Sequence, residues 1–197
     1  MRNIFIAAAF CLITSGLQAS PAGPEPGDSA QIHTTILTFY NWYTKNYQRF
    51  MNYNLYEGIR SKDNPPYRIN WKEAERYFGF IRSSVPQLGE EFIKNLRILL
   101  KQSDSAFKAD PESDMPYNFD YDWYTNSQEE PQVLVDELKK SKQWITTVKG
   151  MDATVDVLGF YMDSGKKVET VIMCFGMKKE KGKWKIARIG CPYQPEN

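Results

Sequence analysis

After residue 140 the apolar side chains of this 197-residue chain stop recurring at helical spacing and begin to alternate with polar ones. Alternation puts successive side chains on opposite faces of a strand, so the change of period indicates a second layer made of β-strands. Short turns at Gly150, Gly165 and Gly182 separate the alternating runs, and short turns force neighbouring strands to be antiparallel. We therefore predict a four-stranded antiparallel meander, with strands at residues 143–149, 152–161, 167–178 and 183–190.

The part of the chain before this meander has helical spacing. A first helix is predicted over residues 29–49, because apolar residues recur there every three to four positions and Asp28 with Gln31 resembles a capping box. The recurring residues are Ile32, Ile36, Phe39, Tyr40, Tyr43 and Tyr47. A short second helix is expected within residues 69–82.

A third helix has the clearest start signal in the chain. Ser83 or Ser84 would be its cap, Pro86 lies in the first turn, two glutamates follow, and the apolar stripe ends near residue 105. Residues 52–70, which are polar and interrupted by glycine and proline, are interpreted as a long surface excursion. Helices followed by an antiparallel meander predict an α+β fold, with N-terminal helices packed on a curved antiparallel sheet of about four strands.

The N-terminus has the pattern of a secretory signal peptide at residues 1–19, with an apolar run from Ile4 to Thr14 and Ala19 before the cleavage site. This run is too short to span a membrane, which takes about 20 apolar residues. Residues 20–30 are rich in proline and glycine and predict a flexible linker, followed by one domain over 31–197. We expect a periplasmic or secreted protein that does not span the membrane. A lipid anchor on Cys11 is not expected, because a bulky phenylalanine precedes it.

Charge and composition argue against two broad classes of protein. Lys and Arg total 25 against 24 Asp and Glu, which gives a net charge of +1 and no broad positive field for binding nucleic acid. Aromatic residues make up 14% of the chain and can bury enough apolar area to offset the entropy of ordering it. A disordered chain is therefore not expected.

The chain lacks the residue patterns of common catalytic and cofactor sites. Its single histidine, His33, lies in the opening turn of the first predicted helix without a Gly-x-Ser-x-Gly elbow, which argues against a hydrolase relay. Two cysteines and one distant histidine cannot supply a structural zinc site. The acids at 110–114 lack the glycine turn and distal glutamate of an EF-hand, and no phosphate-binding glycine loop occurs. We expect no metal and no cofactor.

The strongest candidate for a binding site is the segment 108–130, in which seven acids are interleaved with aromatic rings. Asp120 and Asp122 stand two residues apart, which on an extended strand aims both carboxylates to one side, as acid–base chemistry requires. The alternative is a rim strand with solvated acids and packed rings, and core packing is likewise the default for the aromatic first helix. The candidate ligand-binding residues are Tyr43, Asp120, Tyr121, Asp122, Trp123 and Tyr124.

Cys174 and Cys191 are the cysteines that remain after signal cleavage. With a turn at Lys181 and Gly182, Cys174 lies opposite Ile189 and one diagonal step from Cys191, and moving the turn by one residue places the cysteines directly opposite. Either register permits a disulfide if the Cα atoms lie within about 7 Å. An oxidising compartment favours that bond, and two buried thiols are the alternative.

The sequence Phe-Tyr-Asn-Trp-Tyr at residues 39–43 and the closing Lys-Gly-Lys-Trp-Lys-Ile hairpin at 181–186 resemble the nuclear transport factor two-like, cystatin-related superfamily. More narrowly, Phe-Tyr-x-Trp-Tyr and residues 120–124 with Gln128 resemble a bacterial envelope family of unknown function. The resemblance covers about residues 30–190 and implies a cone-shaped cavity between sheet and helices. Members use that cavity for catalysis, binding or dimerisation.

Two kinds of function fit these observations. The first is a non-enzymatic binding or interaction module that presents the segment 117–124 to an envelope protein or a small-molecule ligand. The second is a small-molecule cavity enzyme, with Asp120 or Asp122 as general base beside Tyr43 or Tyr124. An inhibitor or immunity protein shares the features of the first, and a homodimer is left open.

Overall fold

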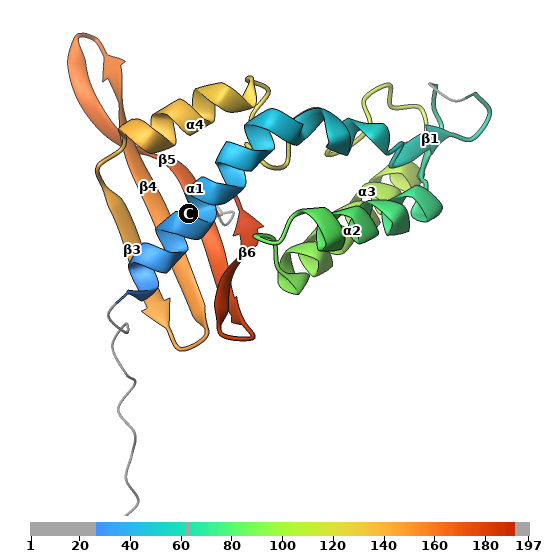
Figure 1. Ribbon diagram of the computed structural model, residues 1–197. Coiled ribbons are helices and arrows are strands. Elements are labelled where there is room, and N and C mark those ends of the chain that lie inside the picture. The colour runs from blue at the N-terminus through green and yellow to red at the C-terminus, as the bar shows by residue number, and fades with distance from the viewer. Residues whose placement is uncertain (1–26, 62–63, 192–197) are drawn as a thin grey trace, which may run out of the picture.

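The computed structural model describes residues 27–61 and 64–191, which form a twisted sheet with helices on one face and a helical arm beyond one edge (Figure 1). The signal peptide predicted at 1–19 lies outside the described residues. Residues 28–30, assigned to the linker from the sequence, instead form the first turn of helix α1 (Asp28–Asn46). Helix α1 therefore begins three residues before the predicted domain boundary.

Four strands form the main sheet in the order β3–β4–β5–β6, and every neighbouring pair is antiparallel. The predicted meander and the α+β class are confirmed, and each strand boundary lies within two residues of its predicted position. Gly150, Gly165 and Gly182 adopt positive φ angles at the three turns, a backbone region that glycine enters without a steric cost. The strands are β3 (Trp144–Lys149), β4 (Asp152–Asp163), β5 (Lys166–Glu180) and β6 (Lys183–Ile189).

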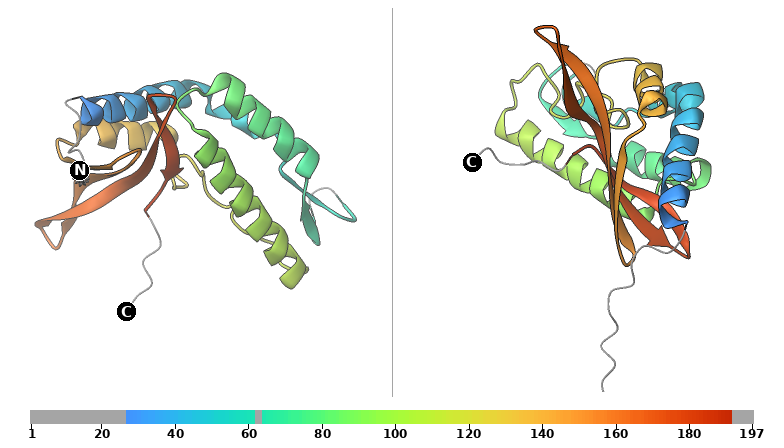
Figure 2. Two further views of the ribbon diagram at one scale, coloured as in Figure 1. Left: turned by 90° about the horizontal axis from the view of Figure 1, so that it is seen from below. Right: turned by 90° about the vertical axis from the view of Figure 1, so that its left-hand side faces the viewer.

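Helices α1 and α4 (Pro131–Lys140) lie side by side on one face of the sheet, as two views agree (Figure 1; Figure 2). The buried residues of α1 recur every three to four positions, as a helix packed on a sheet requires. Alternate residues of the strands are buried in the same core, namely Ala153, Val155, Val157, Met173, Phe175, Met177, Trp184 and Ile186. Helix α4 was not predicted, because its ten residues bury only Pro131, Val135 and Leu138.

The helical arm consists of α2 (Trp71–Ser84), α3 (Glu90–Ala109) and a small hairpin of β1 (Tyr56–Gly58) and β2 (Tyr67–Ile69), and it extends away from the β6 edge of the sheet (Figure 2). The interpretation of residues 52–70 as a surface excursion was wrong in part, since Tyr67 and Ile69 are buried in the core.

The connection between α2 and α3 covers the open edge of β6. The Gly89 N–H donates to the Ile186 carbonyl at 2.9 Å, and the Ile186 N–H donates to the Gln87 carbonyl at 2.8 Å. The predicted serine cap of the third helix was therefore wrong: Ser84 ends α2, and α3 begins after Gly89. Because this connection pairs with β6, α3 starts later in the sequence than predicted. The pairing also leaves the edge of β6 less available to another strand.

Asp28 does not cap α1, contrary to the predicted capping box. Its buried carboxylate accepts a hydrogen bond from the Trp184 indole N–H at 2.8 Å and one from Lys179 Nζ at 3.0 Å. These bonds, that of Trp184 foremost, hold the pKa of Asp28 below its ordinary value of 3.8. The first residue of α1 is thereby tied to β5 and β6, close to the turn that joins them.

We expect Asp28→Asn to lower the thermal unfolding midpoint near neutral pH, because it removes the charge that faces Lys179. In the acid range the unfolded chain binds more protons at Asp28 than the folded chain does, so this stabilisation is present above pH 3.8 and is lost as the pH falls through the lower folded pKa. The difference in unfolding midpoint between the variant and the unmodified protein should therefore become smaller in acid. Thermal unfolding scans at several pH values would measure it. Asp152→Asn, which breaks an exposed pair with Lys178, is the control and should change little.

A disulfide joins Cys174 and Cys191, whose Cα atoms lie 4.7 Å apart. Neither predicted register holds at the cysteines, because a bulge shifts the β5–β6 pairing between Gly176 and Met177. Beyond the bulge the Gly190 N–H donates to the Cys174 carbonyl at 3.0 Å. The shifted pairing places Cys191 next to the partner of Cys174, which is close enough for the bond.

Replacing both cysteines with serine should lower the free energy of unfolding by about 3 kcal/mol, the loop-closure value for a loop of this length. The two residues are 17 positions apart in the sequence. Urea unfolding of both proteins would measure the difference. In a chain that begins at Ser20, thiol titration of the unreduced, denatured protein should find no reactive thiol, and finding both thiols reactive would contradict the bond.

Candidate functional site

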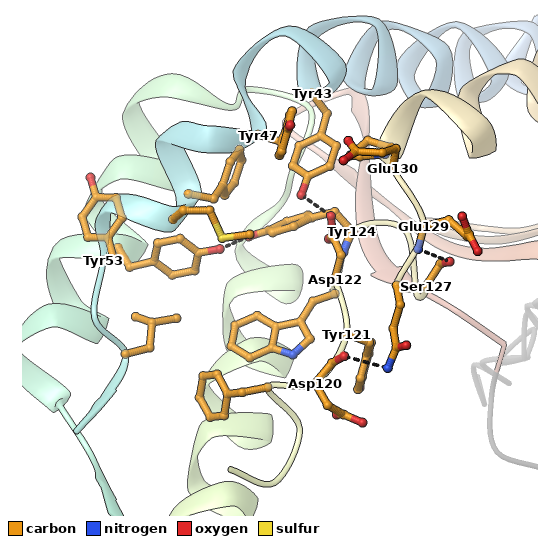
Figure 3. Close-up of a pocket in the computed structure, with 18 of the residues that line it drawn as sticks. Tyr43, Tyr47, Tyr53, Asp120, Tyr121, Asp122, Tyr124, Ser127, Glu129 and Glu130 are labelled. Carbon is orange, nitrogen blue, oxygen red and sulfur yellow. Dashed lines mark hydrogen bonds between the residues drawn. The ribbon is translucent and has the colours of Figure 1, made fainter. Parts of the chain in front are cut away.

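An open cavity of about 820 Å³ lies between the end of α1 and the segment that joins α3 to α4 (Figure 3). One wall comes from the last turns of α1, the 3₁₀ helix η1 (Tyr47–Asn52) and the chain up to Tyr56. The opposite wall comes from residues 119–124 and 127–131. We call this cavity the aromatic groove, because ten of its 20 lining residues are aromatic.

The aromatic groove is not the cavity that the family resemblance implies. None of its described lining residues belongs to strands β3–β6. Between the sheet and α1 the space is filled by side chains such as Tyr40 and Phe175, whose ring centroids lie 5.9 Å apart. The groove thus lies beyond the sheet, where the arm meets α1.

Asp122 occupies the inner end of the groove with both carboxylate oxygens engaged. Tyr43 Oη donates to Oδ2 at 2.6 Å, and the Tyr124 N–H donates to Oδ1 at 2.7 Å. Burial raises the pKa of Asp122, while bonds from Tyr43 and from the backbone of Tyr124 and Thr125 oppose that rise. The carboxylate therefore anchors its own turn to the end of α1.

A network of buried tyrosines supports this anchor. Tyr40 Oη donates to the Tyr124 carbonyl at 2.7 Å, and the hydroxyls of Tyr77 and Tyr124 lie 2.6 Å apart. Burial is the main cause that raises the pKa of Tyr40, Tyr43, Tyr77 and Tyr124 above the ordinary value. These hydroxyls stay protonated and serve as hydrogen-bond donors and acceptors rather than as bases.

The predicted pair of carboxylates does not form. Residues 120–127 fold into turns rather than an extended strand, with Asp122 bridged to Ser127. Asp120 is exposed and its side chain points away from Asp122, while the Asp120 carbonyl accepts a bond from Gln128 (Figure 3). The segment forms turns because the Asp122 side chain accepts a hydrogen bond from the backbone N–H two residues ahead, as aspartates in turns do.

All six predicted ligand-binding residues line the groove, but they lie at different depths. Tyr43 and Tyr124 are each only 2% exposed and form its floor. Tyr121 and Trp123 are half-buried, and the Trp123 indole donates to the Asn118 carbonyl at 2.6 Å. Tyr121 and Trp123 are therefore the predicted rings that offer surface to a ligand.

Sequence reasoning missed the wall of the groove formed by residues 50–56. Phe50, Met51 and Tyr53 line it, although part of this stretch was interpreted as a surface excursion. The available signal was the run of aromatic residues from Tyr47 to Tyr56, which is unusual for a solvated loop.

The lining of the groove is charged with one sign. It includes four acids, Asp120, Asp122, Glu129 and Glu130, and its described residues include no Lys, Arg or His.

His33 lies elsewhere, with Nε2 at 2.8 Å from Thr146 Oγ1 on β3. Among the described residues no group of three His, Cys, Asp or Glu is placed to hold a metal ion. In the same part of the chain, no helix is both long and apolar enough to cross a membrane.

Comparisons of this chain with protein-family models, with curated proteins and with solved structures give no match.

Tyr77→Phe should lower the free energy of unfolding by about 1–3 kcal/mol, because it removes a buried hydrogen-bond partner of the Tyr124 hydroxyl. Tyr161→Phe is the matched control: Tyr161 is 52% exposed at the far end of β4, and its change should stay within about 0.5 kcal/mol. Denaturant unfolding would measure both. If both variants lower the free energy of unfolding equally, the buried tyrosine network does not stabilise the fold.

Proposed function

We propose that this protein is an exported, non-enzymatic binding module and that the aromatic groove is its binding site. The observation that carries the proposal is an open cavity of about 820 Å³ with ten aromatic residues in its lining. This volume is within the range of about 300–1,000 Å³ that is typical of ligand sites. Tyrosine and tryptophan are enriched where proteins bind partners, because they offer large contact areas with little loss of side-chain freedom.

The state of Asp122 favours binding over catalysis. A general base needs a free lone pair directed at the substrate, whereas Tyr43 and Tyr124 hydrogen-bond the two oxygens of this carboxylate. The alternative, a small-molecule cavity enzyme, draws support from the raised pKa of Asp122. It would require a lone pair that these hydrogen bonds leave free to face the substrate.

Export is supported by two independent features. The signal-peptide pattern at residues 1–19 directs a chain out of the cytosol. The bond between Cys174 and Cys191 is of a kind that persists in oxidising compartments such as the periplasm. We therefore propose a periplasmic or secreted location and an envelope protein or small-molecule ligand as partner. The proposal includes membership of the cystatin-related superfamily, with which the α+β arrangement is compatible.

Capture of partners from an envelope extract, with quantitative mass spectrometry, tests the groove. We expect the double variant Met51→Ser with Tyr121→Ala to lower recovery of specific partners about tenfold, since few contacts carry most of a binding energy. The matched control is Met151→Ser with Tyr161→Ala, which alters exposed residues of the same types outside the groove.

The proposal predicts that the control recovers partners as well as the unmodified protein does. If both double variants leave the recovery of partners unchanged, the groove is not the contact surface. If both lower the recovery equally, partners bind a different face of the molecule.

A further inference from the structure

We infer that the aromatic groove binds a cationic peptide segment, with lysine or arginine side chains set against its rings and acids. This inference deepens the proposed function and rests on it, because it assumes that the groove is the binding site. Three features of the groove support it: the charge of its rim, the chemistry of its rings and the shape of its opening.

The rim of the groove carries acids that have no basic partner in the described part of the chain. Asp120, Glu129 and Glu130 are exposed, and none of the ion pairs between described residues includes them. Nine acids elsewhere in the described chain do form ion pairs, for example Glu75 with Arg97. A set of unpaired carboxylates along one opening attracts a ligand of positive charge.

The rings of the groove suit the same kind of ligand. The faces of tryptophan and tyrosine rings attract ammonium and guanidinium groups, and each such contact contributes about 0.5–2 kcal/mol. The protein already uses this contact at a ring that lines the groove, where the Arg76 guanidinium lies 5.9 Å from the centre of the Tyr53 ring. Inside the groove, the half-buried rings of Tyr47, Tyr121 and Trp123 are available for a cation supplied by a partner.

The shape of the groove favours a chain over a small ammonium ion. A small cation is held best by a closed cage of rings, whereas this cavity is open to solvent and, at about 820 Å³, has room for several side chains. The apolar residues Met51, Leu55 and Pro131 also line it and offer contacts for the stem of a lysine or arginine. A peptide with basic and aromatic residues meets both requirements.

Titration calorimetry with three capped heptapeptides tests the inference. The probes are Gly-Tyr-Lys-Leu-Arg-Tyr-Gly and two versions in which both basic residues are replaced by glutamine or by glutamate. We expect the basic peptide to bind at least about tenfold more tightly than the glutamine peptide, and the glutamate peptide to bind least. Raising the salt concentration should weaken the basic peptide most.

Two charge variants test whether the acids of the groove cause the preference for the basic peptide. Glu129→Gln with Glu130→Gln should lower the affinity for the basic peptide to about that for the glutamine peptide. Glu112→Gln with Asp114→Asn changes the charge equally in the same acidic segment but outside the groove lining, and it should leave the affinity unchanged.

Two results would overturn the inference. If the glutamine or glutamate peptide binds as tightly as the basic one, the groove does not select cations, although it still binds and the proposed function stands. If no peptide binds, a basic peptide is not the ligand, and partner capture with Met51→Ser and Tyr121→Ala decides the proposed function separately.

Discussion

Helix α1 connects the two halves of this molecule. Its first turns are held on the sheet, where Asp28 bonds Trp184 and where Ile32 and Ile36 are fully buried. Its last turns carry Tyr40 and Tyr43, whose hydroxyls bond the segment that forms the opposite wall of the groove. A rigid helix that is fixed at both ends sets the position of that segment relative to the sheet, so the geometry of the groove depends on the packing of α1.

The sheet could be predicted because its signals are local. Alternating apolar residues and glycine turns specify strands and hairpins without reference to the rest of the chain. The start of α3 and the hairpin within residues 52–70 depend instead on contacts between distant elements: Gly89 pairs with β6, and Ile69 packs in a core shared with α3. The capping box failed for the same reason, since the partners of Asp28 lie more than 150 positions away.

The candidate site was predicted in composition but not in geometry. Interleaved acids and rings singled out the segment that contains Tyr121 and Trp123, and both residues line the groove. The sequence could not show that Asp122 would turn inward to Tyr43 while Asp120 stayed in solvent, since that difference follows from one turn and one helix 79 positions away. The aromatic run around Tyr53 indicates packing, but assigning Tyr53 to the groove also needs the path of the chain after η1.

The near-neutral charge of the chain and the acidic rim of its groove are consistent with each other. A net charge of +1 produces little field at long range, and salt screens exposed charges beyond about 8 Å under physiological conditions. The carboxylates of Asp120, Glu129 and Glu130 would therefore act only on a ligand that is already close to the groove. Selection would take place at contact, where the rings and the acids act together. The exposed charges of the rim would affect how fast a nearby partner binds, and the contacts with the rings would affect how long it stays.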